Sequence, residues 1–215
     1  MQGKTHMAVG TAAALAIMQP QTVPQIAVGA GAAIIGSLIA DADIPDSKAR
    51  NSVLQVGAAL IIIIGGAYAI EKAFHVGIPE LILQNSNIYR LIFGVAMFFG
   101  LALYSMVQPH RQFTHSFLAM ALYSGAVYVM IPSALLYFVI GYASHLLLDL
   151  LNYTGERLFF PLKKTYSLKL CKSDGMLNKV LFLLGTAATV ILLWESPSMQ
   201  GFVAKVINHF NSIFH

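Results

Sequence analysis

Residues 110–116 read His110-Arg111-Gln112-Phe113-Thr114-His115-Ser116 and separate two apolar runs, residues 88–107 and 117–131. Apolar runs of this kind form membrane helices. Imidazole and guanidinium groups are costly within a membrane, and where they occur they usually serve a function. We therefore interpret the polar stretch as the connection between two membrane helices and as part of an active site.

The composition of the whole chain is that of a membrane protein. Of its 215 residues, 57% are hydrophobic and only 10% are charged, with a mean hydropathy of +0.71, whereas soluble domains carry about 25% charged residues. We predict an all-α fold, a polytopic integral membrane bundle of about five to seven membrane helices. The other apolar stretches are residues 7–18, 23–40, 53–70, 133–151 and 177–194.

Two regions follow from this pattern, a membrane-embedded domain over residues 1–195 and a tail over residues 196–215. In the tail, apolar residues recur at helical spacing from Phe202 to Phe214. This pattern predicts an amphipathic helix that lies in the membrane interface, with docking of the same helix on the bundle as the alternative. Residues 7–18 are too few to span a bilayer alone, because about 20 residues are needed.

The net charge of +4 at pH 7 raises nucleic acid as a partner. The basic residues are spread thinly over loops, however, and no basic recognition helix interleaved with aromatic residues is present, so we expect no nucleic-acid binding. The single cysteine, Cys171, excludes an internal disulfide.

The distribution of lysine and arginine predicts the orientation of the bundle. Alternating the helices across the bilayer places the N-terminus, residues 41–46, residues 110–116 and the last polar loop on one side. Ten of the 13 basic residues lie on that side, against Lys72, Arg90 and Lys205 on the other. Because an excess of basic residues marks the cytoplasmic side, we expect the polar site to face the cytoplasm.

The stretch after residue 144 carries one polar helix face. His145, Asp149 and Asn152 stand at i, i+4 and i+7, while leucines fill most of the positions between them. An i, i+4 pair of histidine and aspartate can bind one metal ion, because imidazole and carboxylate reach the same point. A hydrogen-bonded pair buried between helices is the alternative.

Asp41, Asp43 and Asp46 have Asp-x-Asp-x-x-Asp spacing where an apolar stretch ends. Carboxylates this close repel one another unless a cation neutralises them. The alternative is a solvated helix end, with Asp46 as the cap of the next helix. His6 precedes the first apolar stretch, and it is either an ordinary interfacial histidine or a further ligand on the same side.

Within residues 110–116, Pro109 suits the first turn of the helix that follows, which would place His110 and Thr114 one turn apart. His115 is the better metal ligand, and His110 is a second ligand or a general acid. Arg111 has a planar fork suited to a phosphate, or anchors the helix end at the interface. Thr114 would alternatively bond back to the backbone. Our candidate catalytic residues are His110, Arg111 and Thr114.

Histidines and carboxylates without cysteine favour a site for a divalent metal, Zn²⁺ first and Mn²⁺ or iron as alternatives. With two or more ions, a metal-bound hydroxide would attack phosphorus while Arg111 binds a phosphate oxygen. The position at the bilayer surface favours a membrane lipid or lipid-linked phosphate as substrate. A membrane transporter or channel for a metal ion and a non-catalytic scaffold are the alternatives. Transporters usually bind near the midplane within repeated halves, and the sequence has no internal repeat.

The order of these motifs resembles that of the YdjM-like membrane-bound metal-dependent hydrolases. The matching motifs are Thr5-His6, Asp41-x-Asp43, His110-Arg111-x-x-Thr114-His115-Ser116 and His145-x-x-x-Asp149, and Gly155 and Pro161 also fit. Ala40 and Ile44 depart from the family pattern, which has Pro and often His at those positions. The resemblance implies a hydrolase of the bacterial inner membrane and a distant kinship with zinc-dependent phospholipase C and P1-type nucleases. The metal ligands that it implies are His6, Asp41, Asp43, His115, His145 and Asp149.

Overall fold

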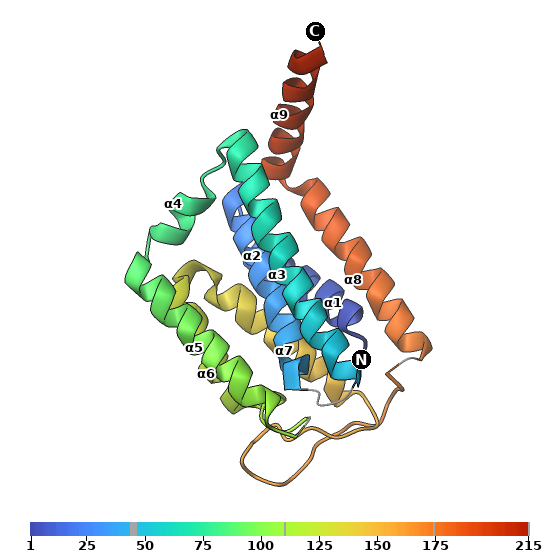
Figure 1. The fold of residues 1–215 in the computed structure, drawn as a ribbon. Coiled ribbons are helices and arrows are strands. Elements are labelled where there is room, and N and C mark those ends of the chain that lie inside the picture. Colours follow the sequence, from blue (N-terminus) through green and yellow to red (C-terminus); the bar gives the residue numbers. More distant parts are fainter. Residues whose placement is uncertain (44–46, 110, 174, 215) are drawn as a thin grey trace.

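A computed structural model of the chain describes residues 1–43, 47–109, 111–173 and 175–214, and for residues 42, 43, 47–56, 213 and 214 it describes the backbone alone. Over this range the chain forms helices without a β-strand, and two isolated bridges pair Asn152 with Cys171 and Glu156 with Tyr166 (Figure 1). The helices are α1 (Gly3–Met18), α2 (Val23–Ile39), the 3-10 turn η1 (Ala40–Asp43), α3 (Ser47–Phe74), α4 (Ile78–Leu83), α5 (Ile88–Met106), α6 (Phe117–Met130), the 3-10 turn η2 (Pro132–Ala134), α7 (Leu135–Leu150), α8 (Met176–Glu195) and α9 (Pro197–Phe214).

Several helices begin at a polar side chain that caps an apolar run. Thr22 accepts a hydrogen bond from the amide of Gln25 at 3.3 Å, and Asn87 accepts one from Arg90 at 3.0 Å. Each cap satisfies one of the amide groups that have no partner in the first turn of a helix. The starts of α2 and α5 therefore follow from capping residues that are visible in the sequence.

The helices have the length and composition of a membrane bundle. Four stretches are long and apolar enough to cross a membrane, Gly57–Phe74, Ile88–Met106, Pro132–Leu150 and Met176–Glu195, and the shorter apolar helices α2 and α6 accompany them. The prediction of an all-α membrane bundle is confirmed.

The most extensive contact between the described helices lies between α2 and α7, which pack along each other. Two glycines permit this approach. A Cβ on Gly141 would lie 2.2 Å from the carbonyl oxygen of Ala33, and one on Gly36 would lie 2.4 Å from that of Phe138. Small residues allow membrane helices to approach backbone to backbone. As a result, the C-terminal ends of α2 and α7 are held together at one end of the bundle.

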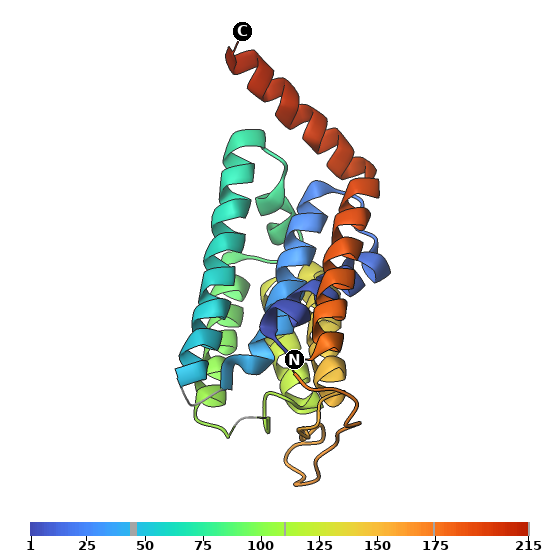
Figure 2. The ribbon, with the colours of Figure 1, turned by 90° about the vertical axis from the view of Figure 1, so that its right-hand side faces the viewer.

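Helix α1 runs from that end toward the opposite one, packed among α2, α7 and α8 (Figure 2). Its 16 residues cover about 24 Å at 1.5 Å per residue, less than the ~30 Å of a bilayer core. The hydroxyl of Ser198 nevertheless donates to the carbonyl of Gln21, so the turn after α1 meets the start of α9. The end of α1 therefore lies at the end of the bundle where α9 begins, and the predicted orientation in the membrane stays a prediction.

The polar loop between α7 and α8 closes the end of the bundle at which α2 and α7 meet. Leu168 donates its amide to the carbonyl of Leu150 at 2.8 Å, and Phe117 donates to that of Leu158 at 2.9 Å. The amide of Arg157 donates to the carbonyl of Arg111 at 3.2 Å. The loop therefore joins the end of α7 to residues 111–117 and covers the side chains that lie between these two segments.

The tail forms α9, which projects from the far end of the bundle (Figure 1). It contacts the end of α3, where the rings of Phe202 and Phe74 are 5.2 Å apart and Lys205 Nζ donates to the carbonyl of Phe74 at 2.7 Å. Its location in the membrane interface stays a prediction.

Candidate metal centre

Three segments bring four metal-ligating side chains together. Asp41 lies in η1 after α2, His115 lies in the turn before α6, and His145 and Asp149 lie on the last turns of α7. One ligand atom of each residue lies within 4.8 Å of the ligand atoms of the other three. The histidines are fully buried, Asp149 is 2% exposed, and the Asp41 side chain is 18% exposed. The group is therefore enclosed within the protein and open on the Asp41 side.

The four side chains direct their ligand atoms at one point. The Nε2 atoms of His115 and His145 are 3.3 Å apart. Asp41 Oδ1 lies 3.8 Å from the first and 3.7 Å from the second, and Asp149 Oδ2 lies 3.7 Å from His115 Nε2. These spacings leave room for an ion among the ligand atoms, whose bonds to nitrogen and oxygen are about 2.0–2.2 Å long.

Backbone groups fix the ring orientation of the histidines. His145 Nδ1 lies 2.7 Å from the carbonyl oxygen of Ser37, and because a carbonyl only accepts, Nδ1 carries the proton. The Nε2 atom of neutral His145 therefore presents a lone pair to the centre. His115 Nδ1 lies 3.1 Å from Thr114 Oγ1, and the Tyr142 hydroxyl donates to the carbonyl of Thr114. Metal-bound histidines are typically oriented through their other nitrogen in this way.

His6 lies beside the group of four without joining it. Its ring is fully buried and stacks on His145, with centroids 3.9 Å apart and an angle of 20° between the rings. His6 Nε2 is 3.1 Å from Asp149 Oδ1. His6, predicted as a metal ligand, thus approaches one oxygen of the Asp149 carboxylate while His115 lies nearer the other.

Asp149 is the most heavily contacted carboxylate of the site. Oδ2 accepts a hydrogen bond from Arg111 Nη2 at 3.0 Å, and Oδ1 accepts one from Asn152 Nδ2 at 2.8 Å, while the Met1 amine contacts the same carboxylate. Arg111 is 18% exposed and its Nη1 also donates to the carbonyl of Thr154 at 2.9 Å. Arg111 therefore connects the buried carboxylate with the rim of the site.

The charge of Asp41 is stabilised within the site. Burial would raise its pKa, but the nearby imidazoles of His145, His6 and His115 outweigh burial and hold the pKa of Asp41 below its ordinary value. The imidazoles act in this way in acid, where their protonated forms attract the carboxylate charge as Asp41 titrates. Asp41 is therefore a carboxylate at neutral pH, which is the form that binds a metal.

Several predicted residues are not placed at the centre. His110 and Asp46 lie outside the described residues, and for Asp43 the structure describes only the backbone, in η1. Pro109 does not lie in the first turn of the following helix, as its position had suggested. Helix α6 begins at Phe117, because the Ser116 hydroxyl accepts a hydrogen bond from the amide of Ala119 at 3.1 Å and caps it there.

The sequence analysis missed one buried carboxyl group, that of Glu156. The side chain is fully buried, and neither carboxyl oxygen has a hydrogen-bond partner among the described residues. Its backbone is fixed by a reciprocal pair of 2.9 Å hydrogen bonds with Tyr166. Burial raises the pKa of Glu156 to about 8, against the opposing charge of His115. The only signal in the sequence is an acid in a loop whose charged residues are mostly basic.

The chain belongs to the YdjM inner membrane protein family, whose model matches residues 1–209. This confirms the resemblance drawn from the motifs, and kinship with phospholipase C and P1-type nucleases stays a prediction. No curated protein and no solved structure matches the chain.

Proposed function

We propose that this chain is a metal-dependent hydrolase that cleaves a phosphoester of a lipid or lipid-linked substrate at the cytoplasmic surface of the membrane. One observation carries the proposal: two imidazoles and two carboxylates from separate segments converge within 4.8 Å of one another. Buried carboxylates and lone pairs that face each other are unfavourable unless a cation compensates them. Because its proton is on Nδ1, His145 presents an Nε2 lone pair to the centre, which suits a metal ligand rather than a hydrogen-bond donor.

The mixed nitrogen and oxygen donors suit zinc first, and manganese or iron as alternatives. When bound, such a cation activates water for attack and polarises the phosphoryl oxygen. Ser37 and Thr114 hold the two imidazoles through Nδ1, so Thr114 acts by positioning His115. The residues that we assign to the metal are Asp41, His115, His145 and Asp149, with His6 as a further contact of Asp149.

Arg111 is the residue that we assign to the substrate. Its guanidinium lies between the Asp149 carboxylate and Thr154 at the exposed rim, where its planar fork would bind phosphate oxygens. The adjoining loop exposes four lysines, which would attract anionic headgroups at a membrane surface. They are Lys163, Lys164, Lys169 and Lys172. Placement of the centre at an end of the bundle, rather than midway along it, supports a headgroup substrate over a transported ion.

Elemental analysis and turnover of the purified full chain test the proposal together. We expect near-stoichiometric metal and release of phosphate or a phosphorylated headgroup from vesicles that contain phosphatidic acid or phosphatidylglycerol. The His145→Gln variant should lose both, while His209→Gln, on the exposed face of α9, should retain both. Bound metal with ion flux into vesicles and no hydrolysis would instead indicate a transporter. A chain without bound metal would indicate a scaffold.

A further inference from the structure

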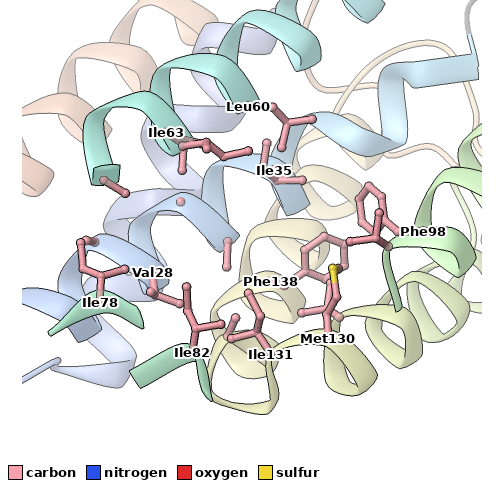
Figure 3. A pocket seen from close by; sticks show the side chains of 18 of the residues that line it. Val28, Ile35, Leu60, Ile63, Ile78, Ile82, Phe98, Met130, Ile131 and Phe138 are labelled. Carbon is pink, nitrogen blue, oxygen red and sulfur yellow. The ribbon is translucent and has the colours of Figure 1, made fainter. Parts of the chain in front are cut away.

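A second feature of the bundle is an apolar cavity of about 400 Å³ among α2 to α7. Figure 3 shows its walls, with Val28 and Ile35 from α2, Leu60 and Ile63 from α3, and Phe98 and Phe138 on the far side. Each of the described residues that line it is apolar. Cavities of this kind stay dry, and one of only ~150 Å³ can bind benzene. The cavity is therefore expected to hold an apolar molecule rather than water.

The cavity opens sideways between α3 and α5. Ile64 on α3 and Phe99 on α5 line it and are 65% and 55% exposed. Both lie in stretches that have the length and composition of membrane spans, Gly57–Phe74 and Ile88–Met106. The medium outside this opening is thus the hydrocarbon of the bilayer, and the molecules that can enter from it are lipid chains.

Helices α2 and α7 carry both the cavity and the metal centre. Ile35 lines the cavity and Asp41 follows six residues later, while Phe138 lines the cavity and His145 follows seven residues later. At 1.5 Å per residue these separations are about 9–10 Å, well within the length of one leaflet. The cavity therefore lies deeper in the membrane, beneath the centre that would hold the headgroup.

An aromatic layer separates the two sites. The ring of Phe98 lies 5.1 Å from Tyr123 and 6.2 Å from Phe138, and the hydroxyl of Tyr142 extends from this layer to the carbonyl of Thr114. A chain that starts at the metal centre would not pass through the layer. It would descend along the outside of the bundle and enter between α3 and α5.

We propose that the cavity binds one hydrocarbon chain of the lipid whose phosphate reacts at the metal centre. This inference rests on the proposed hydrolase function and specifies its substrate as a lipid with at least one long apolar chain. The cavity volume is in the range of ligand pockets, about 300–1,000 Å³. Because the walls carry no polar group, the cavity would select for chain length and bulk and would ignore the headgroup.

Photolabelling of the full chain tests the inference. The probe is phosphatidic acid with a mid-chain diazirine, placed in vesicles of phosphatidylethanolamine and phosphatidylglycerol that contain the protein. We expect label on peptides that carry Leu60, Ile63 and Phe98. Ala67→Trp fills the cavity from α3, and Ala27→Phe fills it from α2. Each should reduce this label by about tenfold, equivalent to about 1.4 kcal/mol. The matched control is Ala69→Trp, on the exposed side of α3, which should leave the label unchanged.

Equal labelling in the filled and control variants, or label spread over the outer faces of all helices, would overturn the inference. Retained metal content in Ala67→Trp and Ala27→Phe shows that they fold. The labelling is repeated in Asp149→Asn, because binding of the lipid chain can be measured without turnover. Label in the cavity without hydrolysis by the native chain removes the proposed function and with it the role of the lipid as substrate. Hydrolysis without label in the cavity removes only the present inference.

Discussion

The two ends of the contact between α2 and α7 are built in opposite ways. The backbones meet at Gly36 and Gly141, and from there toward the C-terminal ends of both helices the buried side chains Ser37, His145 and Asp149 are polar. Toward their N-terminal ends, an apolar cavity separates the same two helices from α3 and α5. Half of Pro132–Leu150 is buried, whereas no part of Gly57–Phe74 is. The difference indicates that the polar region fixes the positions of charged side chains, whereas the region around the cavity can accommodate a variable apolar ligand.

The largest effect is expected from the polar region. Asp149→Ala removes the carboxylate that His6, Arg111 and Asn152 contact. Loss of one ligand should lower metal affinity by at least a hundredfold, more than loss of a supporting residue does. Elemental analysis of purified protein measures it. Glu80→Gln, an exposed position on α4, is the control, and an Asp149→Ala protein with native metal content would remove Asp149 from the ligand set.

Glu156 predicts how the stability of the polar region depends on pH. Its folded-state pKa of about 8 exceeds the ordinary value of 4.5, so the folded protein binds the proton more tightly. The resulting stabilisation is complete below pH 4.5 and is lost as pH rises to about 8. We expect the unfolding free energy of the native chain to fall by on the order of a few kcal/mol across this window.

Glu156→Gln should remove that contribution, because an amide does not titrate. The titratable groups that act on Glu156 are His115, Asp149, Arg111 and the N-terminal amine. They stay in the variant, so the difference between the two pH profiles isolates the carboxyl group. Thermal unfolding in detergent from about pH 5 to 8 measures both. Parallel profiles would show that Glu156 is not buried in its neutral form.

Gly141→Ala tests the tight contact directly. The added Cβ would lie 2.2 Å from the carbonyl oxygen of Ala33, so α2 and α7 must separate. Overpacking of this kind costs about 1–3 kcal/mol, and it should also weaken metal binding because Asp41 and His145 lie on opposite sides of the contact. Gly125→Ala is the matched control, since a Cβ there meets nothing within 4 Å. Equal stability and metal content in both variants would contradict a tight α2–α7 contact.

Sequence patterns predicted the bundle and much of the polar region, and the reasons are local. The apolar runs and their caps define the helices, and the i, i+4 spacing of His145 and Asp149 follows from helix geometry alone. The apolar run 117–131 marks α6 correctly. The placement of Pro109 in its first turn was wrong, because only the observed hydrogen bond from the amide of Ala119 shows that Ser116 caps the helix.

Features that depend on distant segments could not be predicted. Glu156 lies in a loop without periodicity, and its burial depends on pairing with Tyr166 and on packing over residues 111–117. The cavity has no sequence signature either, because its lining residues are ordinary apolar positions of helices. Its volume results from how far α3 and α5 stand from α2, which no single segment determines.

The smallest effect is expected in the apolar region and gives the sharpest contrast. Ala27 lines the cavity, whereas Ala33, on the same helix, is fully buried against Gly141. Leucine has nearly the helix propensity of alanine, so Ala27→Leu and Ala33→Leu differ mainly in the space they meet. Ala33→Leu should destabilise by about 1–3 kcal/mol, as measured by thermal unfolding in vesicles.

Ala27→Leu separates an empty cavity from one that holds lipid. Filling an empty cavity would gain about 0.8 kcal/mol for each methylene buried. Filling a cavity that already holds a hydrocarbon chain only exchanges one apolar contact for another, so its stability in vesicles should change by less than about 1 kcal/mol. A clear stabilisation in vesicles would indicate that lipid does not enter, and a loss as large as that of Ala33→Leu would indicate that α2 is as tightly packed at position 27 as at position 33.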